Sequence, residues 1–133
     1  MKRRGFIKEG SVTIASMGLI GLHSPNPVSE LKKVFVHHVY FWLKEPANTD
    51  AIKQFEQALE ELVSISSIQM YHIGKPADTR REVIDSSYHY SLLVIFKDKK
   101  SHDIYQEHPK HDAFRKVNAE LSSKVIVYDS VDI

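Results

Sequence analysis

The sequence predicts an α+β domain with a ferredoxin-like β-α-β-β-α-β order, in which helices cover one face of a four-stranded antiparallel sheet. Three observations predict it. Four segments rich in β-branched and aromatic residues alternate with two segments that space their apolar residues as helices do. The third strand segment is largely apolar on both faces toward its C-terminal half, which indicates that both faces are covered. The 133 residues have room for one domain with a hydrophobic core.

The first half of the domain contains a strand, a helix and a second strand. Residues 34–43 are rich in valine and aromatic residues and predict the first strand. Asn48 or Thr49 is expected to cap a helix over residues 50–64, where apolar side chains recur at helical spacing. Residues 68–73 predict a short second strand.

The second half begins with the strongest strand signal, over residues 88–97. Ser101 is expected to cap a helix that runs to His108. Pro109 then breaks this helix because proline has no N–H to donate to the preceding turn. A second helical piece follows, and residues 124–131 predict the final strand.

Residues 1–30 predict an export segment and linker, which leaves residues 31–133 as the domain. The order Arg3-Arg4-x-Phe6-Ile7-Lys8 resembles a bacterial twin-arginine export signal. The apolar run at 12–22 is shorter than the roughly 20 residues that a membrane span needs. We expect an exported protein, periplasmic or in the cell envelope, that touches a membrane only through this segment if it stays uncleaved. The alternative is a basic arm without an export role.

Charge and cysteine content exclude several functions. The first thirty residues hold four of the 18 basic and two of the 17 acidic residues, so the remainder has 14 basic and 15 acidic residues and a net charge of −1. Nucleic-acid binding therefore has no electrostatic support. The chain has no cysteine, which excludes disulfides, thiolate catalysis and zinc–cysteine sites.

The first strand predicts an interface. His37, Val39 and Phe41 alternate with residues that point to the other side of the sheet. If the first set meets the helices, Tyr40 and Trp42 lie on an uncovered face, and an exposed apolar patch of this kind marks an interface. We expect a C2 homodimer through this open face. The alternative is a monomer that tolerates these aromatic residues in solvent.

The stretch from Tyr105 to His111 contains most of the chain's potential chemistry. A neutral histidine can remove a proton next to a carbonyl group, and a tyrosine hydroxyl can donate a hydrogen bond to the resulting enolate oxygen. Tyr105 and His111 are the candidates for these two roles. The structural alternative has His108 and His111 capping the broken helix, with Tyr105 packed in the core.

The same stretch also contains residues that could bind a metal. His108 and His111, with His37 nearby, provide three imidazoles, but Pro109 interrupts the helix that would align the first two. We therefore expect no metal, and the sequence contains no cofactor motif.

The chain resembles the stress-responsive dimeric α/β-barrel family, Dabb, from about Val34 to Asp129. The matching residues are His37-His38-Val39-Tyr40-Phe41, Gly74, Phe96, Tyr105-x-x-His108-Pro109-x-His111, Phe114 and Val127-Tyr128-Asp129. The resemblance implies a ferredoxin-like protomer and a dimer whose sheets form a barrel.

The resemblance implies more than one possible function. Many members are known only as stress-induced proteins, whereas some plant members resemble polyketide cyclases that use the tyrosine and the last histidine of the motif as an acid/base pair. Tyr105 and His111 correspond to that pair. The implied ligand pocket lies between sheet and helices and includes His37, Val39, Phe41, His108 and Phe114.

We therefore expect an exported stress-response homodimer that binds a small apolar or aromatic ligand in this pocket, without a cofactor. The alternative is an acid/base enzyme of polyketide-cyclase or isomerase type that uses the His/Tyr pair.

Overall fold

The computed structural model describes residues 27–133, and the residues from Leu31 onward form one compact unit. Within it the elements follow the order β2 (Phe35–Leu43), α2 (Thr49–Leu62), β3 (Met70–Gly74), β4 (Tyr90–Phe96), α3 (Lys99–Gln106), α4 (Pro109–Leu121) and β5 (Ser122–Val131). The predicted order is confirmed, with the second helical region divided at Pro109. The predicted export segment lies almost wholly outside the described residues.

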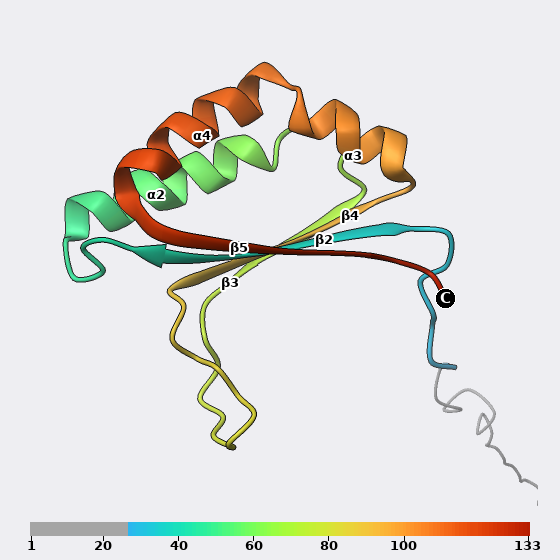
Figure 1. Cartoon of the computed structure of the whole chain (residues 1–133). Helices are drawn as coiled ribbons and strands as arrows, with labels where there is room; N and C mark the ends of the chain where they lie inside the picture. The colour runs from blue at the N-terminus through green and yellow to red at the C-terminus, as the bar shows by residue number, and fades with distance from the viewer. Residues whose placement is uncertain (1–26) are drawn as a thin grey trace, which may run out of the picture. The chain divides into compact units, whose positions relative to one another are not determined.

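The four strands form one antiparallel sheet in the order β3-β4-β2-β5. The first strand of the domain, β2, is central, and its Val39 lies opposite Leu92 of β4 and Val127 of β5. The three helices lie on one side of this sheet (Figure 1). This arrangement confirms the ferredoxin-like prediction.

The core fills the space between the helices and one sheet face. Every second residue of β2 from Phe35 to Leu43 is buried, as the predicted alternation requires. Phe41 packs edge-on against Phe55 of α2 and Phe114 of α4, with ring centroids 5.2 and 5.7 Å apart. This aromatic contact therefore joins the sheet to both long helices. Burying one such side chain contributes roughly 1.5–3 kcal/mol to folding.

The helix caps agree with the sequence in one case and differ in the other. Asn48 caps α2, and its side chain accepts hydrogen bonds from two backbone N–H groups of the first turn. The prediction that Ser101 caps α3 is wrong: Asp98 is the cap, and its Oδ1 accepts from the Ser101 backbone nitrogen at 2.8 Å. A carboxylate three residues ahead reaches that N–H directly, which leaves Ser101 inside the first turn.

Several element ends also differ from the predictions. Strand β3 begins at Met70, because turn hydrogen bonds such as Ile68 N–H to the Ile65 carbonyl occupy the residues before it. Strand β4 begins at Tyr90, and α3 ends at Gln106, so His108 is not on the same helix as Tyr105. Among the described helices, none combines the length and apolar character of a membrane span.

The opposite face of the sheet is covered by none of the described helices (Figure 1). Tyr40 lies there, with its ring centroid 4.9 Å from that of Tyr88 and 6.1 Å from that of Tyr128. Trp42 contacts Tyr88 on the same face, and its Nε1 donates to the Ser87 hydroxyl at 3.1 Å. The connection at residues 75–89 extends from this side and completes a hollow of about 270 Å³. Tyr40 and Trp42 therefore lie on the open face, as predicted.

Candidate functional site

The chain changes direction between α3 and α4, and this change of direction determines where Tyr105 and His111 lie relative to each other. His108 is the N-cap of α4, and its Nδ1 accepts from the Lys110 N–H at 3.0 Å. Pro109 is the first helical residue, a position where the missing N–H costs no hydrogen bond. The new helix returns His111 towards Tyr105, so their ring centroids lie 4.7 Å apart and the planes meet at 89°. His108 and Pro109 thus shape the turn.

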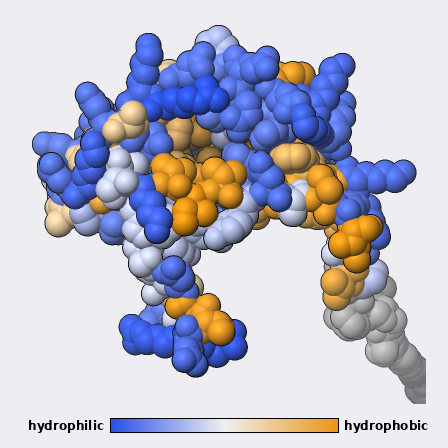
Figure 2. All heavy atoms as spheres, in the orientation of Figure 1, coloured by the Kyte–Doolittle hydropathy of each residue, from blue (hydrophilic) through white to orange (hydrophobic). Residues whose placement is uncertain are grey.

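A pocket of about 120 Å³ lies between the sheet and helices α3 and α4. Six of the residues predicted for a site line it: His37, Val39, Phe41, Tyr105, His111 and Phe114. His108, the seventh, is not among the lining residues, because its ring faces the backbone of Lys110. The half-exposed side chains of Val125 and Val127 form the β5 side of the pocket, where Figure 2 shows apolar side chains gathered below the helices.

Tyr105 is 1% exposed and is held by aromatic contacts. Its ring packs against Phe96 at 5.1 Å and against His37 at 5.7 Å. Burial raises the pKa of the Tyr105 phenol well above its ordinary value, and the nearby Arg115 charge only partly opposes this effect. The hydroxyl therefore stays protonated at neutral pH and can donate a hydrogen bond.

His111 is held neutral by its surroundings. Burial, then the positive charge of Arg115, lowers the pKa of His111 to about 4. Its Nδ1 is buried and has no hydrogen-bond partner among the described residues. A neutral imidazole with an unsatisfied nitrogen beside a pocket is a candidate for contact with a ligand or an ordered water molecule.

His37 makes a short contact that the sequence did not predict. Its Nδ1 lies 2.6 Å from Oδ1 of Asp129, which faces it across the β2–β5 ladder. Burial lowers the pKa of His37, and the hydrogen bond and charge of Asp129 partly oppose that effect. The carboxylate orients the ring by accepting the Nδ1–H bond, so Nε2 carries the free lone pair.

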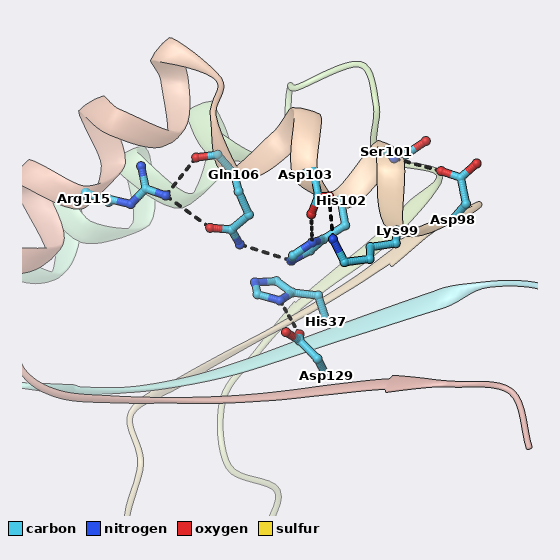
Figure 3. A network of polar contacts seen from close by, with 9 residues as sticks. All are labelled: His37, Asp98, Lys99, Ser101, His102, Asp103, Gln106, Arg115 and Asp129. Carbon is cyan, nitrogen blue, oxygen red and sulfur yellow. Dashed lines mark hydrogen bonds and ion pairs between the residues drawn. The ribbon is translucent and has the colours of Figure 1, made fainter.

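A chain of hydrogen bonds leads from α4 to a second buried histidine (Figure 3). Arg115 Nη2 donates to Oε1 of Gln106 at 3.1 Å, so the Gln106 amide nitrogen faces Nε2 of His102 at 3.3 Å and donates to it. The other ring nitrogen of His102, Nδ1, then carries the proton and faces Asp103 at 3.1 Å. This chain fixes the tautomer of His102, whose ring centroid lies 5.1 Å from that of His37.

The family follows from a comparison with family models. The model described as Stress responsive A/B Barrel Domain, Dabb, matches residues 35–132. The chain belongs to the Dabb family. A comparison with curated proteins found no match.

Solved structures agree with this Dabb assignment. A Dabb family protein with a ferredoxin-like fold from Mesorhizobium loti is 25% identical, with a TM-score of 0.63, over 75% of this chain and 97% of that one. A dimeric ferredoxin-like protein of unknown function from Thermobifida fusca is 16% identical, with a TM-score of 0.61, over 82% and 100% of the two chains. A hydroxynitrile lyase from Passiflora edulis is 16% identical, with a TM-score of 0.63, over 77% and 96%. The last two show the fold alone.

The Dabb site contains polar residues that sequence reasoning missed. The sequence predicts Asp129 only as part of the family resemblance, and it predicts no role for His102, which lies one helical turn before Tyr105. Neither residue carries a local signal, because each meets its partners only when β2, β5 and α3 come together. The three-histidine grouping of His37, His108 and His111 does not form, since His108 caps α4.

Acid should destabilise this Dabb domain through His111. An unfolded histidine titrates near 6.5, whereas folding lowers the pKa of His111 to about 4. Between these values the unfolded chain binds a proton that the folded chain does not, so the free energy of unfolding falls as the pH drops through this window. Urea denaturation between about pH 7 and about pH 4 measures the effect.

The His111→Gln variant should lose part of this pH dependence, whereas His72→Gln, on an exposed residue of β3, should keep it. Some dependence remains in His111→Gln, because burial lowers the pKa of His37 in the same direction. An unchanged pH dependence in His111→Gln would show that His111 is protonated equally easily in the folded and unfolded chains.

Proposed function

We propose that this Dabb protein is a homodimer that binds a small apolar or aromatic molecule in the pocket between sheet and helices. One observation carries the proposal: an apolar pocket has a buried hydroxyl donor, Tyr105, and a neutral imidazole, His111, on the same wall. A ligand with an apolar body and one polar group matches that wall. Val39, Phe41 and Phe114 form the apolar side.

The volume of the pocket limits the ligand. Its 120 Å³ is close to the roughly 150 Å³ of an apolar cavity that accepts a benzene ring, and below the roughly 300 Å³ at which drug-sized pockets begin. A molecule of one ring is therefore near the upper limit. Phenol is a suitable probe, because its hydroxyl can accept from Tyr105 and donate to His111.

Titration of the full chain with phenol, monitored by NMR of the protein, tests this proposal. Phenol should shift the signals of Tyr105 and His111, and 1-naphthol, with two rings, should bind at least roughly tenfold more weakly because it overfills the pocket. His111→Leu removes both ring nitrogens while it fills similar space, and it should weaken phenol binding by roughly 2- to 12-fold, the loss of one hydrogen bond.

The matched control is His108→Asn, which keeps a side chain able to cap α4 and lies outside the pocket lining. Its phenol affinity should equal that of the natural protein. Equal affinities for phenol and 1-naphthol, or an unaffected His111→Leu variant, would rule out this pocket as the binding site.

The open face of the sheet is the basis for proposing a dimer. The rings of Tyr40, Trp42, Tyr88 and Tyr128 form an aromatic surface there, and side chains such as Met70 and Tyr128 are 54% and 63% exposed. A soluble monomer gains nothing from exposing such a surface, and a second copy placed by a two-fold axis would cover it with the same residues. The Thermobifida fusca protein that shares the fold is described as dimeric.

An acid/base enzyme is the second candidate, and the contact between Tyr105 and His111 favours it. In this scheme His111 removes a proton from the carbon beside a carbonyl group, and the Tyr105 hydroxyl donates to the enolate oxygen that forms. Polyketide-cyclase and isomerase reactions both use this step. The hydroxynitrile lyase from Passiflora edulis shares the fold, which is thus compatible with a lyase.

Deuterium exchange tests this second function without a known substrate. The protein should speed the exchange of the methyl protons of acetophenone, a one-ring ketone, in deuterated water, and His111→Leu should abolish this effect while the dimer persists. Because the pKa of His111 is about 4, its base form predominates above that value, so the rate should stay level with falling pH until about 4. A rate that halves near pH 6.5 would point to another base.

We also propose that the protein is exported through residues 1–30, as the Arg3-Arg4 pair suggests. Twin-arginine export carries folded proteins, so the domain would fold before it crosses the membrane. Replacing both arginines with lysine should keep the protein inside the cell, measured by fractionation of a bacterial host with a twin-arginine pathway. The natural sequence serves as the control, and unchanged export of the double variant would exclude this route.

A further inference from the structure

A cluster of side chains beside the pocket brings together groups that bind transition metals. His37 of β2, His102 of α3 and Asp129 of β5 each offer one ligand atom, and these three atoms lie within 4.8 Å of one another. Figure 3 shows the three side chains between α3 and the sheet. We infer that His37, His102 and Asp129 bind a divalent transition metal ion of the zinc type.

The donor set selects this class of ion. Two imidazoles and one carboxylate suit zinc and its first-row neighbours, whereas magnesium and calcium prefer oxygen ligands alone. The three residues come from positions far apart in the chain, on three different elements, so helical or strand periodicity does not account for their meeting. Three protein ligands leave a fourth position for water or a small anion, as in catalytic zinc sites.

Binding of zinc requires only a small adjustment of the distances between the ligand atoms. Zinc bonds of about 2.0–2.2 Å place tetrahedral ligand atoms roughly 3.4 Å apart. Asp129 Oδ1 now lies 2.6 Å from His37 Nδ1, with a proton between them. For an ion to bind at Nδ1, that proton would move to Nε2 of His37, which keeps the imidazole neutral. The Asp129 side chain, 42% exposed, is free to move outward by the necessary amount.

The surroundings of His102 resemble the outer shell of a metal site. Metal-binding histidines generally donate their other N–H to a carboxylate, which orients the ring. His102 Nδ1 faces Asp103 at 3.1 Å, and Lys99 holds Asp103 in turn at 2.7 Å. Among the residues that the structure describes, the lone pair of His102 Nε2 meets only the 3.3 Å contact from Gln106, which an ion would displace. Asp129 supplies one negative charge directly to the ion, while the charge of Asp103 is shared with Lys99.

Zinc titration of the full chain, purified without a histidine tag, tests the inference by calorimetry. We expect one zinc ion per chain and no measurable binding of magnesium. Asp129→Asn and His102→Gln should each weaken zinc binding by more than the roughly 10- to 100-fold that an outer-shell substitution such as Asp103→Asn costs. The visible spectrum of the cobalt(II) complex should indicate four-coordination.

Two controls make the result decisive. His72→Gln removes an exposed imidazole on the opposite sheet face and should leave zinc binding unchanged. Asp129 is exposed, so Asp129→Asn should fold normally by circular dichroism while losing the rise in melting temperature that zinc causes in the natural protein. Equal zinc affinity in Asp129→Asn, or binding that disappears in His72→Gln, overturns the inference.

The test is independent of the proposed ligand pocket. Zinc binding is measured without phenol, and phenol binding through Tyr105 and His111 is measured without zinc. Failure of one titration therefore leaves the other intact.

Discussion

Replacing Tyr40 with glutamate should convert the proposed homodimer into a folded monomer. Tyr40 lies on the central strand β2, and its ring contacts Tyr88 and Tyr128 on the open face. Under C2 symmetry each substitution occurs twice, so the two carboxylates would lie in one interface without partners. Loss of an interface hot spot costs about 2–4 kcal/mol, or roughly 30- to 1,000-fold in the dissociation constant. Sedimentation equilibrium across a range of concentrations measures this change.

Ile104→Glu is the matched control for the dimer experiment. Ile104 is 51% exposed on α3, on the helical side of the sheet, so this charge should leave the dimer intact. Tyr40 is only partly buried within the protomer, and the monomeric variant should keep its far-ultraviolet circular dichroism spectrum. A Tyr40→Glu protein that sediments as a dimer would place the interface elsewhere.

Replacing Tyr105 with alanine should cost about 3–5 kcal/mol of the free energy of unfolding, as large aromatic truncations in cores do. The side chain is 1% exposed, and its ring contacts Phe96, His37 and His111. A domain with a stability of roughly 5–15 kcal/mol would lose much of it. Urea denaturation gives the value. Tyr71→Ala, at a side chain 51% exposed on β3, should change stability by less than about 1 kcal/mol.

Tyr105→Phe separates packing from chemistry at the same residue. The ring is kept, so most of the stability should remain, and only the hydroxyl is lost. In a binding protein without turnover, phenol affinity should fall by roughly 2- to 12-fold, the value of one hydrogen bond. In an acid/base enzyme the rate should fall by roughly 100- to 1,000-fold, because the donor acts on charge that develops in the transition state. A variant that binds and reacts normally would make Tyr105 a core residue alone.

The sequence was informative wherever neighbouring residues determine the structure. The alternation of β2 predicted that His37, Val39 and Phe41 lie on one face of the sheet, and that Tyr40 and Trp42 lie on the other. Both faces of a strand are set by a period of two residues, which needs no knowledge of the rest of the chain. The cap of α3 was missed because serine and aspartate compete for the same role, and the N–H that is reached depends on where the helix begins.

The candidate site was only half predictable. Tyr105 and His111 lie six residues apart, and the break at Pro109 that brings their rings together is a local feature. His37 could be assigned to the pocket side, but its partner Asp129 is 92 residues away. The pairing depends on the register between β2 and β5, which the packing of the whole sheet selects.

The sequence alone therefore determined the order of elements, the two faces of the central strand and the kink that carries Tyr105 and His111. Only the tertiary structure decided the size of the pocket, the neutral state of His111, and the meeting of His37, His102 and Asp129. The physical reason is the distance along the chain over which each effect acts. Periodicity, capping and proline geometry act over a few residues, whereas volume, burial and contacts between strands and helices depend on segments that are distant in the chain.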